Sequence, residues 1–498
     1  MKNYHIKFLV FYLLFTGCKS NKELNKTAAR ETFYKEQKTF ETPINNYLNN
    51  NFYVLHTLNE RKFTSKIDSL KYIFSSHLKK HKQKLDEKTY KDESLAIQYS
   101  FEKYILNYPL YHRNFTGNSI SVSKENENRV LNNLKIINDF KNLENQYFEK
   151  YVKSYIDLSS EKLFNTKVFK GKDNQQLLSN LEIVDSIISS KKVKCYLQRD
   201  YFYKHIDNNG IKNLESLYRD FTSSCSDLVD TSNLESIYKN HVNNRKTHSI
   251  ETYKKVDGFN LDIHLFFPDS TVYKGNRPTI VYFHGGSWSQ GKPDYFFETA
   301  KQYAKKGWIA TAVEYRTMGR HGTYPYEALK DAKTAIRWLR KNANRLNIDE
   351  KKIVATGNSA GGHLSIASVL VDNWNENSDN LNISAVPNIV MVNAAVYDLT
   401  NNSSKWITTY NSDKKLVYEI SPNELIKKTD TKFLMIHGEN DRNCPYKTAE
   451  NFYTRMKLLQ NDVELYTIKD AEHFIWFGKH SDEVEKITEN YLKRKLED

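Results

Sequence analysis

One serine of this chain stands in a segment that is unusually rich in glycine. Residues 355–368 read ATGNSAGGHLSIAS, in a chain with only 17 glycines among 498 residues. Glycine is used where the backbone turns sharply or approaches another group closely. The spacing around Ser359 is G-x-S-x-G, which presents a serine as a nucleophile on a strained turn; the alternative is a plain tight turn into a helix. A serine hydroxyl is a weak nucleophile by itself, so catalysis would also require a base and a group that holds the base.

Both partners occur later in the chain. Asp441 lies in HGENDRNCP (437–445) and His473 in DAEHFIW (470–476), each just after a predicted strand. Nucleophile, acid and histidine then follow the order found in α/β hydrolases. His473 would accept the serine proton, and Asp441 would fix the histidine tautomer. Asp470 and Glu439 are the nearest rival acids, and Asp441 is preferred because it occupies the loop directly after its strand.

Acyl transfer also needs hydrogen-bond donors for an oxyanion. The segment HGGSW (284–288) follows a predicted strand and resembles the HGGG loop of esterases, with serine at the third glycine position. Backbone N–H groups of Gly286, Ser287 and Ala360 are the predicted donors. This chemistry requires no metal and no organic cofactor, so none is expected.

The elements that must position these residues are readable in the second half of the chain. Short β-rich runs alternate with helical segments, which predicts a mostly parallel, doubly wound sheet. A helix over 326–346 is expected to bury one face, formed by Leu329, Ala332, Ala335, Ile336 and Leu339. The predicted strands are 260–267, 279–284, 308–315, 352–357, 388–396, 432–438 and 463–468.

The first half has a different composition. Up to residue 245 there are four glycines and two prolines, against thirteen and seven after residue 257. Few such residues over a long stretch indicate helices. The predicted fold is therefore an α/β-hydrolase fold preceded by an all-α domain. The expected divisions are a signal peptide over 1–17, a polar tether over 18–42, a helical domain over 43–247 and the hydrolase domain over 248–498.

The N-terminus resembles a bacterial lipoprotein signal. A basic start, MKNYHIK, is followed by the apolar run FLVFYLLF (8–15) and then by TGC. The run is shorter than the roughly 20 residues needed to span a bilayer but suits a signal peptide. Lipidation of Cys18 is expected to anchor the protein in the cell envelope, at the outer membrane and facing either the periplasm or the surface. Of the other cysteines, Cys195 and Cys225 could pair, which their spacing does not decide.

The charge of the chain is unevenly distributed. Residues 18–247 carry 38 Lys and Arg against 28 Asp and Glu, and most of the net charge of +14 lies there. Such an excess either attracts anionic partners or reflects an ordinary solvated surface, and the second interpretation is favoured. No zinc-finger, RNA-recognition or basic-zipper pattern occurs, so no nucleic-acid partner is expected.

Together these segments resemble one group of α/β hydrolases. HGGSWSQGK, VEYRT, YPYEALKDAKTAIRWLRKNA, GNSAGGHL, HGENDRNCPY and AEHFIW are similar to bacterial bifunctional feruloyl and acetyl-xylan esterases. The resemblance implies a serine esterase that removes O-acyl groups from carbohydrates, and Trp288, Trp406 and Tyr326 are candidate substrate contacts. Two alternatives remain: a serine exopeptidase of the prolyl-oligopeptidase type, and a catalytically inactive glycan-binding lipoprotein.

Overall fold

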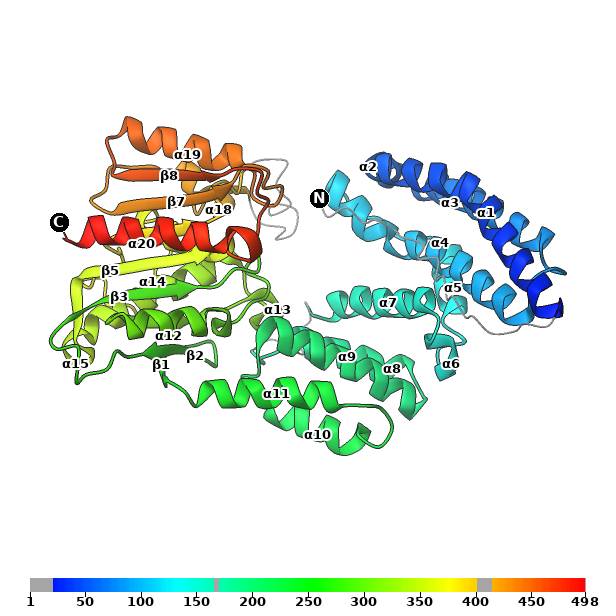
Figure 1. Ribbon diagram of the computed structural model, residues 1–498, viewed down its shortest axis with the longest axis horizontal. Coiled ribbons are helices and arrows are strands. Elements are labelled where there is room, and N and C mark those ends of the chain that lie inside the picture. The colour runs from blue at the N-terminus through cyan, green and yellow to red at the C-terminus, as the bar shows by residue number, and fades with distance from the viewer. Residues whose placement is uncertain (1–20, 165–168, 170, 401–413, 498) are drawn as a thin grey trace. The chain divides into compact units, whose positions relative to one another are not determined.

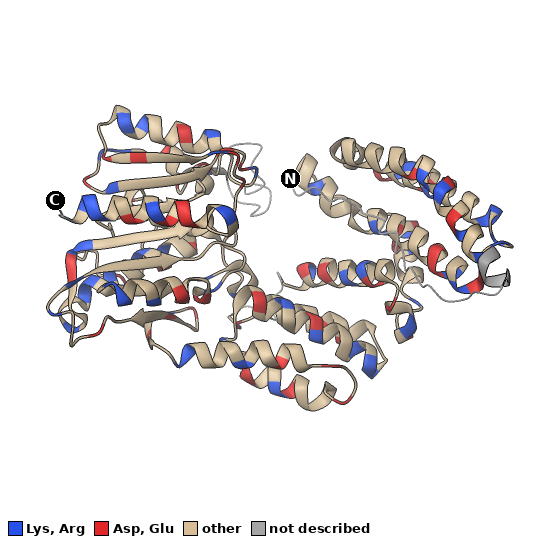
Figure 2. Cartoon of the chain, viewed as in Figure 1, with Lys and Arg blue, Asp and Glu red and all other residues tan. Residues whose placement is uncertain are grey.

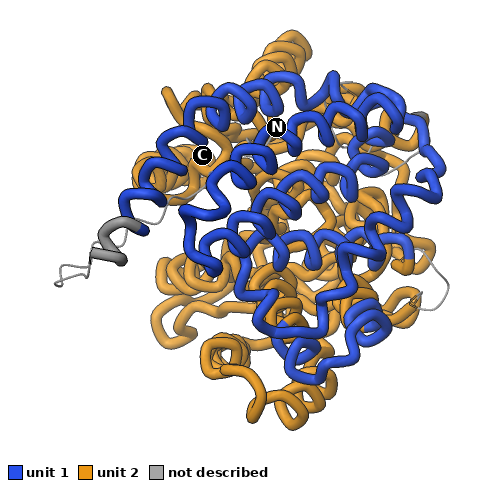
Figure 3. The backbone as a smooth tube through the Cα atoms, turned by 90° about the vertical axis from the view of Figure 1, so that its right-hand side faces the viewer, with its two compact units in different colours: residues 1–162, 182–196 blue, residues 163–181, 197–498 orange. Residues whose placement is uncertain are grey.

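The computed structural model describes residues 21–164, 169, 171–400 and 414–497. The chain divides into two compact units, coloured separately in Figure 3: residues 1–162 with 182–196, and residues 163–181 with 197–498. The division falls inside three helices, α7 (Gln146–Phe164), α8 (Gln175–Ile187) and α9 (Lys191–Asn209), and not at residue 247 as the sequence predicted. The reason is that the chain after residue 197 makes buried ion pairs with the sheet domain: Lys212, in the turn after α9, lies 2.6 Å from Glu314, which follows strand β4 (Ile309–Val313).

Unit 1 is a bundle of helices around an aromatic core. Its buried side chains include Phe33, Phe63, Phe74, Phe101 and Tyr108, and all five belong to one apolar cluster. The helices that lie wholly or partly in this unit are α1 (Asn21–Asn50), α2 (Phe52–Thr57), α3 (Glu60–Lys80), α4 (Glu87–Thr116), α5 (Lys124–Asn133), α6 (Phe140–Leu143), α7 (Gln146–Phe164), α8 and α9.

The predicted polar tether is wrong for the part that the structure describes. Residues 21–42 belong to helix α1, and Phe33 on that helix is fully buried. The buried positions Phe33, Gln37, Ile44 and Leu48 recur at helical spacing and form a narrow stripe. The polar residues that outnumber them cover the exposed side of the helix, so the average composition concealed the stripe.

Unit 2 is built on one eight-stranded sheet of order β1-β2-β4-β3-β5-β6-β7-β8 (Figure 1). The first two pairings, β1 with β2 and β2 with β4, are antiparallel, and all later pairings are parallel. The strands are β1 (Ser249–Val256), β2 (Phe259–Phe266), β3 (Arg277–Phe283), β4 (Ile309–Val313), β5 (Ile348–Asn358), β6 (Ile389–Asn393), β7 (Lys432–Gly438) and β8 (Val463–Ile468).

Helices cover both faces of this sheet, as expected for a doubly wound fold. Successive residues of β3 alternate between faces: Ile280 packs in the cluster of α12 and α20, and Val281 packs in that of α14 and α16. Figure 1 shows α12 and α20 in front of the sheet and α14 behind it. Among the described residues, the helices that lie wholly in unit 2 are α10 (Glu215–Cys225), α11 (Ser232–Arg245), α12 (Phe297–Lys305), α13 (Met318–His321), α14 (Pro325–Lys341), α15 (Ala343–Leu346), α16 (Ala360–Leu370), α18 (Lys414–Tyr418), α19 (Tyr446–Leu458) and α20 (Ser481–Glu497), with short 3-10 turns at Pro293–Phe296, Pro422–Glu424 and Gly478–His480.

The sheet agrees closely with the sequence pattern. All seven predicted strands are present, and the helix expected over 326–346 is α14 followed by α15. The sequence missed β1, whose residues SIETYKKV are mostly polar because it is an edge strand with little buried surface. The predicted lipidation site Cys18 and the candidate contact Trp406 lie outside the described residues.

Charged residues of both signs are interspersed along the helices of unit 1, as α7 illustrates in Figure 2. This arrangement is typical of a solvated surface. Among the residues that the structure describes, no helix combines the length and apolarity needed to cross a membrane.

Several buried histidines of unit 2 make stability depend on pH. Burial lowers the pKa of His205 and of His264 to about 3, and that of His284 to about 4. These histidines stay neutral in the folded protein, whereas in the unfolded chain they take up protons near pH 6.5. Their contribution to the free energy of unfolding is therefore fully present above pH 6.5 and is lost as the pH falls towards 4. Each histidine accounts for a loss on the order of 3 kcal/mol.

We expect the midpoint of thermal unfolding to fall steadily between pH 7 and pH 4.5. His205→Gln should make this fall shallower, whatever its effect on stability at pH 8, because it removes one group that titrates on unfolding. Calorimetry across this pH range is the measurement. A midpoint that is independent of pH would contradict the assignment of these histidines as buried and neutral.

Candidate active site

Ser359 occupies a strained turn between β5 and α16. It is the N-cap residue of α16 and has φ 52° and ψ −119°, a left-handed conformation that side chains rarely adopt. Glycine is required on both sides of Ser359 because the backbone there approaches strand β3 closely. A Cβ on Gly357 would lie 2.3 Å from the Phe283 carbonyl oxygen, and a Cβ on Gly361 would lie 1.9 Å from the same atom. The G-x-S-x-G spacing therefore packs a strand–turn–helix corner directly against β3.

Asp441 and His473 meet at the ends of β7 and β8. His473 Nδ1 donates to Asp441 Oδ2 at 2.7 Å, with both side chains buried. The other carboxylate oxygen accepts the backbone N–H groups of Asn443 and Cys444, each at 2.8 Å. Because a carboxylate only accepts hydrogen bonds, His473 carries its proton on Nδ1 and presents the lone pair of Nε2. That is the tautomer that a general base requires.

Asp441 is held ionised by its surroundings. Burial raises the pKa of this carboxyl, but hydrogen bonds from His437, His473 and the Cys444 N–H outweigh burial, so the pKa lies below its usual range. His437 Nε2 lies 3.3 Å from Asp441 Oδ2 and 2.8 Å from the Cys444 carbonyl oxygen. The sequence analysis missed His437, and its place at the end of β7, four residues before Asp441, was the available signal.

The rival acids contact each other and not the histidine. The Asp470 N–H donates to Glu439 Oε2 at 3.2 Å, and both side chains are exposed. The geometry thus selects Asp441 among the three acids that the sequence offered.

The HGG loop lies beside Ser359. A Cβ on Gly285 would lie 3.5 Å from the Ser359 Cβ. Gly286, Ser287 and Trp288 have φ values of 116°, 56° and 53°. The loop therefore turns sharply, and a Cβ on Gly286 would lie only 2.1 Å from the Gln290 carbonyl oxygen. Ala360 is the first residue of α16, so no carbonyl of its own helix accepts its N–H. The loop and this helix start are thus adjacent, as an oxyanion site requires.

The residues after the loop cap the end of α9. The last carbonyls of a helix have no partner within it. Lys292 Nζ donates to the Ile206 carbonyl at 2.9 Å, and the Gly291 N–H donates to the Asn208 carbonyl at 2.8 Å. The positive charge of the ammonium group also interacts favourably with the negative C-terminal end of the helix dipole. Residues 197–209 of α9 therefore fix the segment that leaves the HGG loop, a support that sequence reasoning did not predict.

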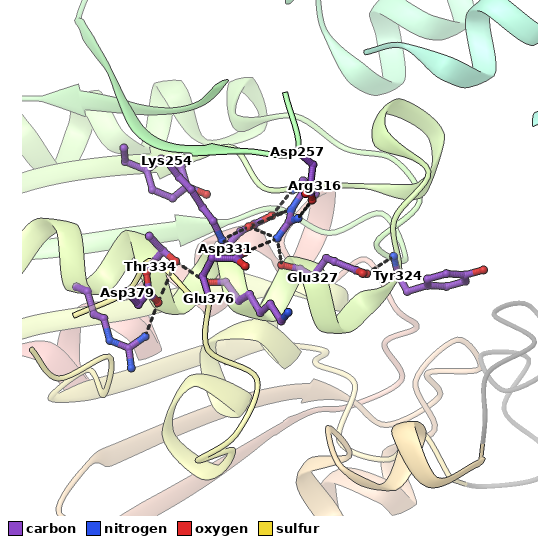
Figure 4. A network of polar contacts seen from close by, with 12 residues as sticks. Lys254, Asp257, Arg316, Tyr324, Glu327, Asp331, Thr334, Glu376 and Asp379 are labelled. Carbon is purple, nitrogen blue, oxygen red and sulfur yellow. Dashed lines mark hydrogen bonds and ion pairs between the residues drawn. The ribbon is translucent and has the colours of Figure 1, made fainter. Parts of the chain in front are cut away.

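A second support involves the residues that follow β4, where Figure 4 shows a network of polar contacts around Arg316. Arg316 and Lys254 bind the fully buried Asp331 of α14 at 2.9 and 2.6 Å, and both also contact Glu376. Burial raises the pKa of Asp331, but the two cations lower this pKa by more than burial raises it, so the carboxyl is ionised. The adjacent Tyr315 donates its hydroxyl to the His284 carbonyl at 2.7 Å. The network thus fixes the strand end that holds the start of the HGG loop.

Two of the three candidate substrate contacts are placed by the structure. Trp288 is fully buried in the core, with its ring 4.9 Å from that of His363, so its side chain exposes no surface to a ligand in this structure. Tyr326 packs against Tyr324 and Trp374. Its assignment as a substrate contact stays a prediction.

Asp441 and His473 also belong to a group with metal-ligand chemistry. One ligand atom from each of Asp441, Cys444 and His473 lies within 4.8 Å of the others. The oxygen and nitrogen that face each other already share a hydrogen bond. The geometry is explained by that bond without an ion.

Part of the chain is similar in sequence to known proteins. Residues 261–456 match the family model BD-FAE. The second half of the chain has an α/β-hydrolase fold. It is similar to esterase LipC of Mycobacterium tuberculosis, 27% identical over 218 residues that cover 39% of this chain and 52% of the relative. Carboxylesterase NlhH of the same organism is 36% identical over 107 residues, 21% of this chain and 32% of the relative.

Two further similarities were found. The uncharacterized peptidase YuxL of Bacillus subtilis is 25% identical over 237 residues, which cover 44% of this chain and 34% of YuxL. The structure of esterase 2 from Thermogutta terrifontis aligns with this chain at 29% sequence identity and a TM-score of 0.47. The alignment covers 50% of this chain and 94% of the esterase 2 chain. The chain thus spans about half or less of the length of the curated relatives named above.

Proposed function

We propose that the protein is a serine carboxylesterase that removes O-acyl groups, of the acetyl or feruloyl type, from polysaccharides or oligosaccharides. The observation that carries the ester-hydrolase part is the strained Ser359 at the start of α16, beside an HGG loop and in one domain with a hydrogen-bonded Asp441–His473 pair. The esterase relatives support the same reaction. The carbohydrate part rests on the match to BD-FAE and on the motif resemblance.

The proposed reaction proceeds in two acyl transfers. His473 Nε2 takes the Ser359 hydroxyl proton while the oxygen attacks the ester carbonyl, and the proton then passes to the departing sugar hydroxyl. Asp441 stabilises the imidazolium that forms between these events. Backbone N–H groups of Gly286, Ser287 and Ala360 receive the oxyanion. Water, activated by His473, attacks the acyl-enzyme and releases the acid and free Ser359.

The choice of substrate is tested with paired panels. We expect turnover of chromogenic acetate and feruloyl esters and release of acid from acetylated or feruloylated oligosaccharides. The second candidate, an exopeptidase, is favoured by the similarity to YuxL and predicts cleavage of aminoacyl anilides instead. Rapid anilide cleavage with slow ester turnover would contradict the esterase proposal. If small esters were hydrolysed but no acylated glycan were, only the carbohydrate part of the proposal would be contradicted.

We further propose that lipid on Cys18 anchors the enzyme in a bacterial cell envelope. The basic, apolar and TGC segments of the N-terminus support this placement. Labelled palmitate should enter the full-length chain and not its Cys18→Ser variant. Equal labelling of both would contradict the anchor.

The cap on α9 predicts a kinetic effect far from the reacting atoms. Lys292→Met keeps the side-chain length but removes the donor to Ile206, so the segment leaving the HGG loop loses one fixed contact. Loss of an entire oxyanion donor costs about 100- to 1,000-fold in kcat, so we expect a smaller fall of roughly tenfold. The expected signature is a lower kcat and weaker binding of a boronate transition-state analogue, with KM nearly unchanged.

Lys305→Met is the matched control, because Lys305 is an exposed lysine at the end of α12. It should leave kcat within about twofold of the wild type. Equal effects of the two substitutions, or an increase in KM alone for Lys292→Met, would show that the α9 contact does not position the loop.

A further inference from the structure

Three side chains with metal-ligand chemistry converge in unit 1, in the helical part that the esterase reaction does not use. Glu36 lies on α1, and His77 and His81 lie one turn apart on α3. One ligand atom from each lies within 4.8 Å of the other two. Glu36 Oε2 is 3.3 Å from His81 Nε2 and 4.0 Å from His77 Nδ1.

The remaining ring nitrogens are held by backbone carbonyls. His77 Nε2 lies 3.1 Å from the Phe33 carbonyl, and His81 Nδ1 lies 3.1 Å from the His77 carbonyl. A carbonyl oxygen only accepts, so these two nitrogens carry the protons. In the neutral rings, His77 Nδ1 and His81 Nε2 therefore present lone pairs towards Glu36. Metal-bound histidines are oriented in this way, by donation from the opposite ring nitrogen.

Two lone pairs and a carboxylate that face one another repel unless a cation lies between them. A proton on His81 Nε2 would satisfy its 3.3 Å contact with Glu36, but the 4.0 Å contact of His77 is too long for a hydrogen bond. A metal ion with bonds of about 2.0–2.1 Å would engage all three groups after a small movement. Glu36 can make that movement because its side chain is 54% exposed.

The histidines are held more firmly than the carboxylate. Both are buried, and the His77 ring stacks on Phe33 with ring centroids 4.8 Å apart. Phe40 meets the same ring edge-on at 5.2 Å. Two imidazoles are thus already oriented as metal ligands, and one exposed carboxylate can move to become the third ligand.

We propose that Glu36, His77 and His81 bind one divalent transition-metal ion, with Zn²⁺ as the best match. Two imidazoles and one carboxylate suit Zn²⁺ in tetrahedral coordination, with water in the fourth position. Ca²⁺ and Mg²⁺ do not fit, because both prefer oxygen ligands. The ion joins α1 to α3 and so stabilises the start of the bundle. This proposal is independent of the esterase activity.

The test uses the full chain, stripped with a chelator and titrated with Zn²⁺ against a coloured indicator. Wild type is expected to bind one ion that Glu36→Gln and His81→Gln each weaken. The loss should exceed the roughly 10- to 100-fold that follows removal of an outer partner of a metal ligand. Zn²⁺ should also raise the thermal midpoint of wild type more than that of either variant.

Two controls separate this site from other zinc binding. Glu31→Gln changes an exposed carboxylate on the same helix and should bind Zn²⁺ as wild type does. His473→Ala disrupts the Asp441–Cys444–His473 group of unit 2 and should leave the Glu36-dependent ion in place. Zinc binding that is unchanged in Glu36→Gln and His81→Gln would overturn the proposal. So would the absence of binding to wild type, which would leave only an ion pair between His81 and Glu36.

Discussion

Replacing Ser359 with alanine is expected to lower kcat for a chromogenic acetate ester by about 10⁵- to 10⁶-fold, to the level left by binding and oxyanion contacts alone. The reason is that the substitution removes the hydroxyl that the left-handed turn at Ser359 presents. Alanine suits the N-cap less well than serine, but the Ser359 side chain makes no capping hydrogen bond there, so the fold should persist. Steady-state kinetics with a thermal melt of each protein provide the measurement.

Ser365→Ala is the matched control, because Ser365 is a buried serine on the same helix whose hydroxyl only donates to the Gly361 carbonyl. It should retain kcat within a few fold. A fluorophosphonate probe should label wild type and Ser365→Ala and fail to label Ser359→Ala. Labelling of all three proteins, or equal activity of all three, would place the nucleophile at another residue. Absence of both labelling and activity in wild type would revive the alternative of an inactive glycan-binding protein.

Asp441→Asn is expected to lower kcat by about 10⁴-fold with little change in KM. The carboxylate accepts the proton on His473 Nδ1 at 2.7 Å and so fixes the active tautomer. An amide at this position can donate to Nδ1, which would place the histidine proton on Nε2 and remove the base. The same substitution alters the contact with His437, so the thermal midpoint must be measured in parallel.

Asp470→Asn and Glu439→Gln are the controls for this substitution. Both change exposed carboxyl groups, and the Glu439 carboxylate accepts the backbone N–H of Asp470. Neither should alter kcat by more than about threefold. If one of them abolished activity while Asp441→Asn retained it, the acid would have been assigned to the wrong loop.

Much of the candidate site was readable from the sequence because its signals are local. A strand followed by G-x-S-x-G and a helical stripe predicts the turn at Ser359, and strand ends predicted where Asp441 and His473 would lie. Seven strands were found in the same way, since buried parallel strands are short apolar runs. The edge strand β1 escaped because only part of it is buried. Helix α1 escaped because its few buried residues are outnumbered by polar ones.

The sequence by itself therefore determined the fold class, the order of the strands along the chain and the three candidate catalytic residues. The periodicity of apolar residues and the residue types of turns depend on neighbouring positions only, so both can be read directly from the sequence. Only the tertiary structure decided that Asp441 and not Asp470 meets His473, that Trp288 is a core residue, and that Lys292 caps a helix which ends at Asn209. It likewise brought Glu36 within reach of His77 and His81. These contacts join residues tens of positions apart, and packing alone sets which of many compatible side chains come together.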